Sequence, residues 1–149
     1  MESIQGNSTD AAAFRKQLRS HLHLTYTWLR GELQDFLTPF DVSIQQINLL
    51  EILRASDTPL STKQLAGLMS DKNSDTSRMV DRLVKKNLLR KRKNTSDRRL
   101  VQVSINYEGL KLLAQVEDAF VEKDAELFPF SAEKLMQLNA LLAKIPQPK

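Results

Sequence analysis

The starts of three helices are marked clearly in this sequence, and they constrain the fold more than any other feature. Ser43 can cap a helix while Gln46, three residues later, can bond back to the cap. The same pair of residue types recurs as Ser61 and Gln64, and Ser131 provides a third cap without the glutamine. Helices are therefore predicted to begin directly after each of these three serines.

A long amphipathic helix is predicted before the first cap, over about residues 11–37. Its apolar residues recur at alternating spacings of three and four, so one face should hold Leu18, Leu22, Tyr26, Leu29, Leu33 and Phe36. Beyond the short helix predicted at 62–69 come a polar turn at 70–73 and a further helix at 74–86. Asn87 should end that helix, because asparagine tolerates the left-handed conformation found there.

The periodicity changes after Asn87. Residues 88–93 and 100–105 can both extend as strands, and the second alternates apolar with polar side chains. The segment between them, 94–97, consists of residues that favour turns. A β-hairpin is therefore predicted, with Arg98 and Arg99 at its tip.

The order of these elements matches a winged helix-turn-helix. Asn106 can cap another long helix, which Pro129 should break, and the helix after Ser131 completes the chain. The predicted fold class is mainly α: a winged helix-turn-helix lobe with a small β-hairpin wing, flanked by long N- and C-terminal helices.

Positive charge is concentrated in the middle of the chain. Residues 61–105 hold 12 basic and 4 acidic side chains, whereas the whole chain has a net charge of only +4. Such a segment can be a solvated face, a membrane-surface patch or a nucleic-acid footprint. The charge alone leaves these alternatives open.

Several classes of protein are disfavoured by what the sequence lacks. It contains no cysteine, no Gly-rich phosphate loop and no Ser/His/Asp signature, so neither an enzyme nor a cofactor is expected. His21 and His23 should point to nearly opposite faces of a helix, so no metal site is expected. No apolar run reaches bilayer length and the first ten residues do not resemble a signal peptide, which predicts an intracellular protein with no membrane partner.

Double-stranded DNA is the partner that this architecture favours. The second helix of the motif would enter the major groove, where Arg78 could donate two hydrogen bonds to guanine, and the wing would approach the minor groove. Asp97 is expected to orient Arg99 as a minor-groove finger. The full set of expected DNA contacts is Ser61, Thr62, Asn73, Ser74, Asp75, Thr76, Ser77, Arg78, Arg82, Lys85, Arg98 and Arg99. The alternative for residues 74–86 is a solvated amphipathic helix. The alternative for the hairpin tip is a type I turn with two solvated arginines.

Residues 43–108 resemble the MarR family of bacterial transcriptional regulators, and two stretches carry most of the likeness. Residues 97–109 are similar to the family's Asp-x-Arg wing, its Val-x-Leu-Thr-like strand end and the following helix with glycine in its first turn. Residues 78–89 are similar to its recognition helix and exit. The sequence departs from the family at Asn87, where Gly is common, and at Asn106, where Thr is usual.

This resemblance implies a cytoplasmic homodimer on a pseudo-palindromic operator, with half-sites about 34–36 Å apart. It implies three regions: an N-terminal dimerisation helix (11–40), a DNA-binding lobe (41–105) and C-terminal dimerisation helices (106–146). The expected dimerisation residues are Leu18, Leu22, Leu29, Phe120, Leu135, Leu138 and Leu142. Packing of these helices within a monomer is the alternative.

The resemblance also implies that a small aromatic or anionic effector binds between the dimerisation helices and the lobe. The residues considered for it are His23, Tyr26, Trp28 and Arg30, for which plain core or interface packing is the alternative. The leading hypothesis is a sequence-specific repressor. A winged module for nucleoid architecture or protein interaction is the main alternative, and RNA binding is disfavoured by an aromatic content of 6%.

Overall fold

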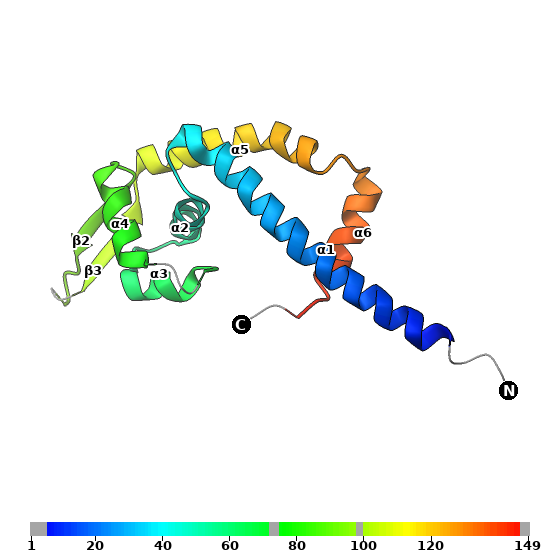
Figure 1. Cartoon of the computed structure of the whole chain (residues 1–149). Helices are drawn as coiled ribbons and strands as arrows, with labels where there is room; N and C mark the ends of the chain where they lie inside the picture. The colour runs from blue at the N-terminus through cyan, green and yellow to red at the C-terminus, as the bar shows by residue number, and fades with distance from the viewer. Residues whose placement is uncertain (1–5, 72–74, 98–99, 147–149) are drawn as a thin grey trace. The chain divides into compact units, whose positions relative to one another are not determined.

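The computed structural model describes residues 6–71, 75–97 and 100–146 of the chain. The structure divides into two compact units, residues 1–113 and residues 114–149. Figure 1 shows the order of the elements, with the small sheet in the first unit. The predicted fold class, mainly helical with a small antiparallel sheet, is confirmed.

The predicted helix caps are present. Helix α1 spans Gly6–Leu37, and a single 3-10 turn, η1 (Thr38–Phe40), separates it from α2 (Ile44–Ala55). At the start of α2 the Gln46 N–H donates to the Ser43 hydroxyl at 3.2 Å, and the Ser43 N–H donates to the Gln46 side chain at 3.0 Å. The same box, built from Ser61 and its Gln partner, starts α3 (Thr62–Leu68).

Helix α4 is shorter than predicted. It spans Thr76–Lys85, because Asp75 is its N-cap and accepts a hydrogen bond from the Arg78 N–H. Beyond its C-terminus Asn87 has a φ of 59°, the left-handed conformation predicted for this position. The Leu88 N–H then donates to the Leu83 carbonyl at 2.9 Å, which closes the helix end.

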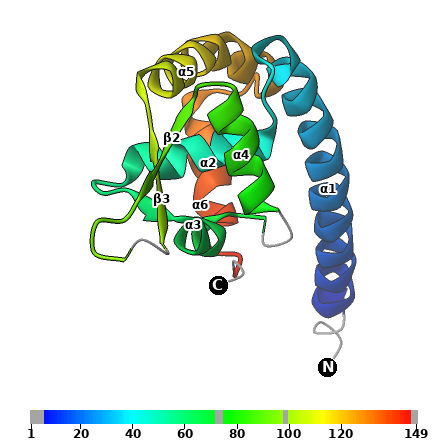
Figure 2. The same cartoon turned by 90° about the vertical axis from the view of Figure 1, so that its left-hand side faces the viewer.

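Three strands form the sheet, in the order β1-β3-β2. Strands β2 (Leu89–Lys93) and β3 (Val101–Ile105) form the predicted antiparallel hairpin, paired from Leu89 with Ile105 to Lys93 with Val101. Strand β1 (Leu60–Ser61) pairs with the other edge of β3 and was not predicted, because two residues are too few to show an alternating pattern. Figure 2 shows the hairpin beside helices α2, α3 and α4.

The core of the first unit lies between these helices and the sheet. Most of the fully buried side chains come from α2, α3, α4 and β3, and they include Leu49, Leu50, Leu65, Val80, Leu83 and Val103. Helix α5 (Tyr107–Leu127) begins here, capped by Asn106, whose side-chain oxygen accepts the Gly109 N–H at 2.9 Å. A side chain at Gly109 would meet the Leu88 carbonyl at 2.4 Å, so only glycine fits this close approach.

The second unit contains the end of α5 and helix α6 (Ala132–Leu142), which the Ser131 hydroxyl caps as predicted. Helix α6 has no buried residue, and its large apolar side chains Leu138 and Leu141 are exposed. In the parts of the chain that the structure describes, no helix combines the length and the apolar character needed to cross a membrane.

Candidate nucleic-acid interface

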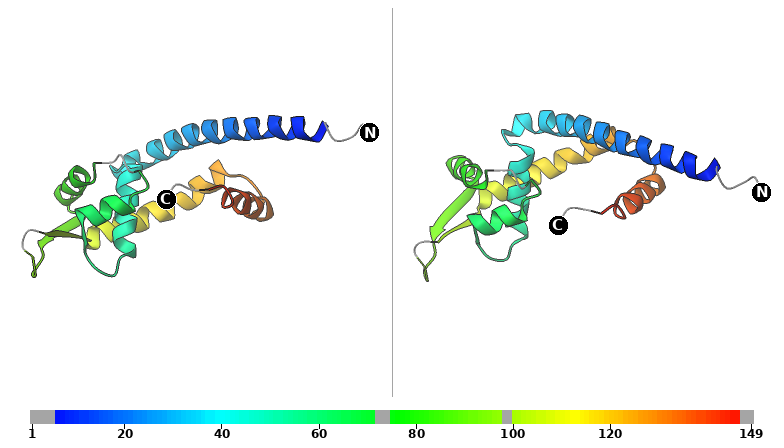
Figure 3. Two further views of the ribbon diagram at one scale, coloured as in Figure 1. Left: turned by 90° about the horizontal axis from the view of Figure 1, so that it is seen from below. Right: turned by 60° about the horizontal axis from the view of Figure 1, so that its bottom comes forward.

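The exposed face of α4 carries the polar and cationic residues expected of a recognition helix. Its apolar side chains Met79, Val80 and Leu83 are buried, and this fixes the opposite face outward. That outward face presents Ser77, Arg78, Arg82 and Lys85. Figure 3 shows α4 and the β2–β3 hairpin at the same end of the first unit, with the N-terminal part of α1 extending away from them.

Asp75 holds Arg78 at the N-terminal end of α4. Its carboxylate accepts the Arg78 backbone N–H at 3.1 Å and lies 3.1 Å from the Arg78 Nε. The Arg78 side chain is nevertheless 80% exposed, so its terminal nitrogens face solvent with a restricted orientation. The structure thus gives Asp75 a capping and orienting position.

Thr76 requires a correction. It was expected to contact DNA, but it is only 5% exposed, because the first turn of α4 faces inward at this position. Its hydroxyl has no hydrogen-bond partner in the described part of the chain. A residue in this position can affect DNA binding only through the packing of α4.

The other expected contacts are placed in part. Ser61 and Thr62 are half-buried at the start of α3, and the Ser61 hydroxyl is engaged as the helix cap. Asn73, Ser74, Arg98 and Arg99 lie outside the described residues. In the wing turn, Asn94 accepts hydrogen bonds from the N–H groups of Ser96 and Asp97, at 2.7 and 3.3 Å.

An ion pair ties the recognition helix to the wing. Lys91 of β2 donates a hydrogen bond to the Asp81 carboxylate of α4. That bond and the charge of Lys91 hold the pKa of Asp81 below its ordinary value of 3.8, and Lys85 adds to the effect. Because Lys91 is already paired with Asp81, it is less available to bind another anion than a cation of β2 without such a partner would be.

A second ion pair, between Lys86 and Asp41, joins the end of α4 to the turn before α2. Sequence reasoning missed both pairs. Asp81 and Lys91 are ten residues apart and Asp41 and Lys86 are 45 apart. Nothing in the local sequence distinguishes them from the other charged residues on the surface.

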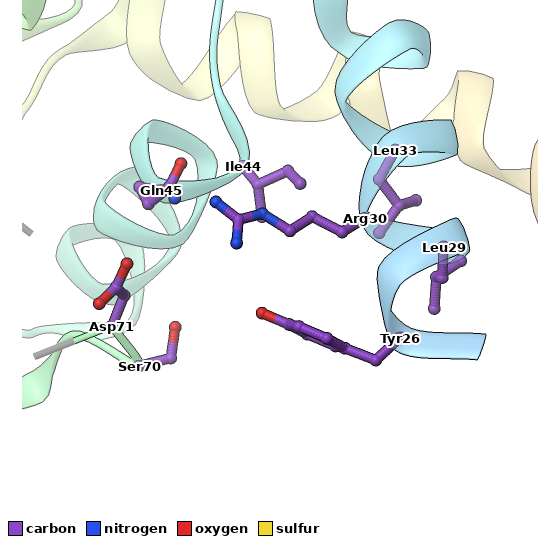
Figure 4. Close-up of a pocket in the computed structure, with 8 residues that line it drawn as sticks. All are labelled: Tyr26, Leu29, Arg30, Leu33, Ile44, Gln45, Ser70 and Asp71. Atoms are coloured by element: carbon purple, nitrogen blue, oxygen red, sulfur yellow. The ribbon is translucent and has the colours of Figure 1, made fainter. Parts of the chain in front are cut away.

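A groove of about 600 Å³ lies between α1, the start of α2 and the segment after α3. It is lined by Tyr26, Leu29, Arg30, Leu33, Ile44, Gln45, Ser70 and Asp71. Figure 4 shows the side chains of Tyr26 and Arg30 reaching from α1 toward α2 and Ser70. Of the four residues considered for an effector, Tyr26 and Arg30 line this groove, whereas His23 and Trp28 are not among its lining residues.

In the residues that the structure covers, no group of three or more His, Cys, Asp or Glu side chains is arranged to hold a metal ion. Most of the candidate-site side chains that the structure describes lie on α4, on β2 and around the groove. The arrangement presents hydrogen-bond donors and positive charge on an exposed helix.

Comparison with known proteins connects this geometry to DNA-binding regulators. The MarR family model matches residues 42–101. The HTH-type transcriptional regulator PecS of Dickeya dadantii is 28% identical over 116 residues, which cover 76% of this chain and 70% of that protein.

Solved structures share the fold. A mutant MarR from E. coli complexed with operator DNA has a TM-score of 0.73 and 25% identity, covering 87% of this chain and 94% of that one. BpsR of Bordetella bronchiseptica, whose DNA binding is regulated by 6-hydroxynicotinic acid, has a TM-score of 0.74 and 18% identity, covering 91% and 97%. At 18% identity the likeness to BpsR shows the fold alone.

Proposed function

The chain carries a MarR family winged helix-turn-helix domain, and on that premise we propose that it is a sequence-specific regulator of transcription, acting as a repressor on a pseudo-palindromic operator. The observation that carries this proposal is the outward face of α4, where Asp75 holds Arg78 exposed and restricted in orientation. A guanidinium held in this way can donate two hydrogen bonds to guanine with less loss of conformational entropy.

The domain division follows from this function. Residues 41–105 form the DNA-binding lobe, and residues 11–40 and 106–146 form the dimerisation region of a homodimer. Support comes from apolar side chains left exposed on α1 and α6, including Leu18 at 51% and Leu138 at 45%. Exposed apolar residues at helical spacing favour burial against a second copy.

The dimer is tested by sedimentation velocity on two variants of α1. Leu18→Glu places a charge in the apolar stripe and is expected to shift the chain to a monomer. Ser20→Glu adds the same charge on the opposite face of the helix and should leave the dimer intact. A wild-type chain that sediments as a monomer at every concentration would rule out the dimer.

Sequence specificity is tested by selection from a random duplex library of about three helical turns, at physiological salt. A two-fold-symmetric motif with half-sites one turn apart is expected. Arg78→Ala should then cost about 1–3 kcal/mol on the selected site and much less on random DNA. A featureless or merely A·T-rich pool would instead support the architectural alternative.

The groove between α1 and α2 is the proposed effector site. Arg30 supplies a cation and Tyr26 an aromatic ring, which suit a small aromatic anion. Binding such a molecule would change DNA affinity only if it prefers one arrangement of α1 and the lobe.

The effector proposal is tested with a panel of aromatic carboxylates, measuring both calorimetric binding and release of the selected duplex. Arg30→Ala should abolish binding of any active compound. Arg19→Ala, a matched change on α1 outside the groove, should not. Equal loss in both variants would show that the arginines act through general charge.

A further inference from the structure

Two adjacent lysines at the C-terminal end of α4 have different surroundings. The Lys86 ammonium donates a hydrogen bond to the Asp41 carbonyl and lies 2.9 Å from the Asp41 carboxylate. Both lysines and Asp41 line a second groove, of about 580 Å³. Within the described ranges, however, Lys85 forms no salt bridge. The two charges are therefore not equally available to a phosphate.

Asp41 occupies the turn that joins α1 to α2. It follows η1 with a φ of 56° and a ψ of 38°, a left-handed conformation that costs a non-glycine residue free energy unless its surroundings hold it there. The Asp41 N–H donates to the Thr38 carbonyl at 3.0 Å, and Lys86 engages the carbonyl and the carboxylate. All three polar groups of Asp41 are thus used.

This contact connects two elements that are distant in sequence. On one side is the end of α1, and on the other is the last turn of α4, where the Lys86 N–H bonds to the Arg82 carbonyl at 3.0 Å. The Lys86 side chain is 31% exposed and that of Asp41 is 89% exposed. A phosphate that approached Lys86 would compete with the Asp41 carboxylate for the same ammonium group.

We propose that Lys86 is a positioning residue that locks the recognition helix to the α1–α2 turn, and that Lys85 beside it supplies the phosphate contact. This inference rests on the proposed DNA-binding function and assigns different roles to two neighbouring lysines. Because α1 belongs to the proposed dimerisation region, the lock also fixes the recognition helix relative to the dimer.

The lock is first tested on the full-length protein without DNA, by hydrogen exchange of the backbone amides. Lys86→Gln is expected to raise exchange several-fold at residues 82–87, because the last turn of α4 loses its tether. Lys85→Gln is the matched control and should leave exchange there unchanged. Equal exchange in the two variants would overturn the lock.

The second test measures affinity against salt concentration, for the selected duplex and a random duplex of equal length. Lys86→Gln should lower specific affinity about two- to fivefold, as expected for the loss of an exposed ion pair, with an unchanged salt slope. Lys85→Gln should weaken binding to both duplexes and reduce the slope by about 0.9, the loss of one phosphate contact. Lys86→Arg should restore specific affinity, since a guanidinium can reach the same two oxygens.

Asp41→Asn separates the lock from simple electrostatics. Asparagine tolerates the left-handed turn, and removal of a carboxylate near DNA would by itself strengthen binding. If the lock operates, specific affinity falls instead. Tighter binding by Asp41→Asn, or a smaller salt slope for Lys86→Gln, would make Lys86 a phosphate contact and contradict the inference.

A wild-type chain that binds neither duplex would overturn the proposed function. The hydrogen-exchange comparison would still decide whether Lys86 tethers α4. Failure of the lock and failure of the function are therefore separate outcomes.

Discussion

The winged lobe and the helices α1 and α6 bury their apolar residues to very different extents. In the lobe, Leu50, Leu65 and Val80 have no exposed surface. On α1 and α6, by contrast, Phe14 is 66% exposed and Leu141 is 63% exposed. The lobe buries most of its large apolar residues, with Leu68, Leu100 and Val101 as exceptions, whereas α1 and α6 leave more of their apolar surface exposed.

The largest expected effect comes from shortening a core residue of the lobe. Leu50→Ala removes a fully buried side chain from α2 and should destabilise the protein by about 2–5 kcal/mol, independent of protein concentration. Leu138→Ala on α6 should instead change how the unfolding midpoint depends on concentration. Urea denaturation at two concentrations checks both, and identical behaviour would remove the distinction between the regions.

A smaller loss is expected where the lobe meets α5. In Gly109→Ala the added carbon would lie 2.4 Å from the Leu88 carbonyl and 2.7 Å from the Ile105 side chain, a clash expected to cost about 1–3 kcal/mol. In Gly31→Ala on α1 the added carbon would have no neighbouring atom within 4 Å. This change should stabilise the helix by roughly 0.5–1 kcal/mol. Thermal unfolding measures both changes, and destabilisation by Gly31→Ala would place that face of α1 in a tight interface.

Asn87 tests the lobe at the end of the recognition helix. Asn87→Ala should cost about 1–2 kcal/mol, because its φ of 59° is unfavourable for a side chain that cannot bond locally. Asn87→Gly should be neutral or stabilising in the same chemical denaturation. A loss in the glycine variant would mean that the asparagine side chain itself is required, for instance through its Oδ1, which lies 3.5 Å from the Asn106 side-chain N–H donor.

The smallest effect is the pH dependence of the Asp81–Lys91 pair. Since Lys91 lowers the folded pKa of Asp81, the pair stabilises the protein above the ordinary value of 3.8, and this contribution is lost as the pH falls toward the lowered folded pKa. Asp81→Asn should therefore show a flatter decline in stability below that value. Parallel curves for the two proteins, measured by urea unfolding from neutral to acidic pH, would contradict the assignment.

Local sequence determined much of the lobe. The serine caps, the left-handed Asn87 and the two strands of the hairpin follow from residues within a few positions of one another, and all are present in the structure. The MarR resemblance, carried by the wing and the recognition helix, is confirmed by the family match over residues 42–101. Short-range hydrogen bonds and the alternation of side chains are sufficient for these features.

The start of α4 marks the limit of that approach. Asp75, Thr76 and Arg78 were all expected at the DNA surface because they sit near the start of a polar helix. The structure makes Asp75 the cap, buries Thr76 and leaves Arg78 exposed. Successive residues of a helix are rotated by about 100°, so these three side chains point in different directions. The exact first residue of a helix is poorly fixed by its sequence, so the directions could not be assigned in advance.

Only the tertiary structure decided which distant residues meet. The pairing of Leu60 with Val103, and the ion pairs of Lys86 with Asp41 and Lys91 with Asp81, join residues ten to 45 positions apart. No local pattern encodes such contacts, because they depend on how the helices pack around the shared core. The sequence by itself thus specifies most of the elements and several of their ends. Packing selects which of several similar lysines faces a carboxylate and which faces solvent.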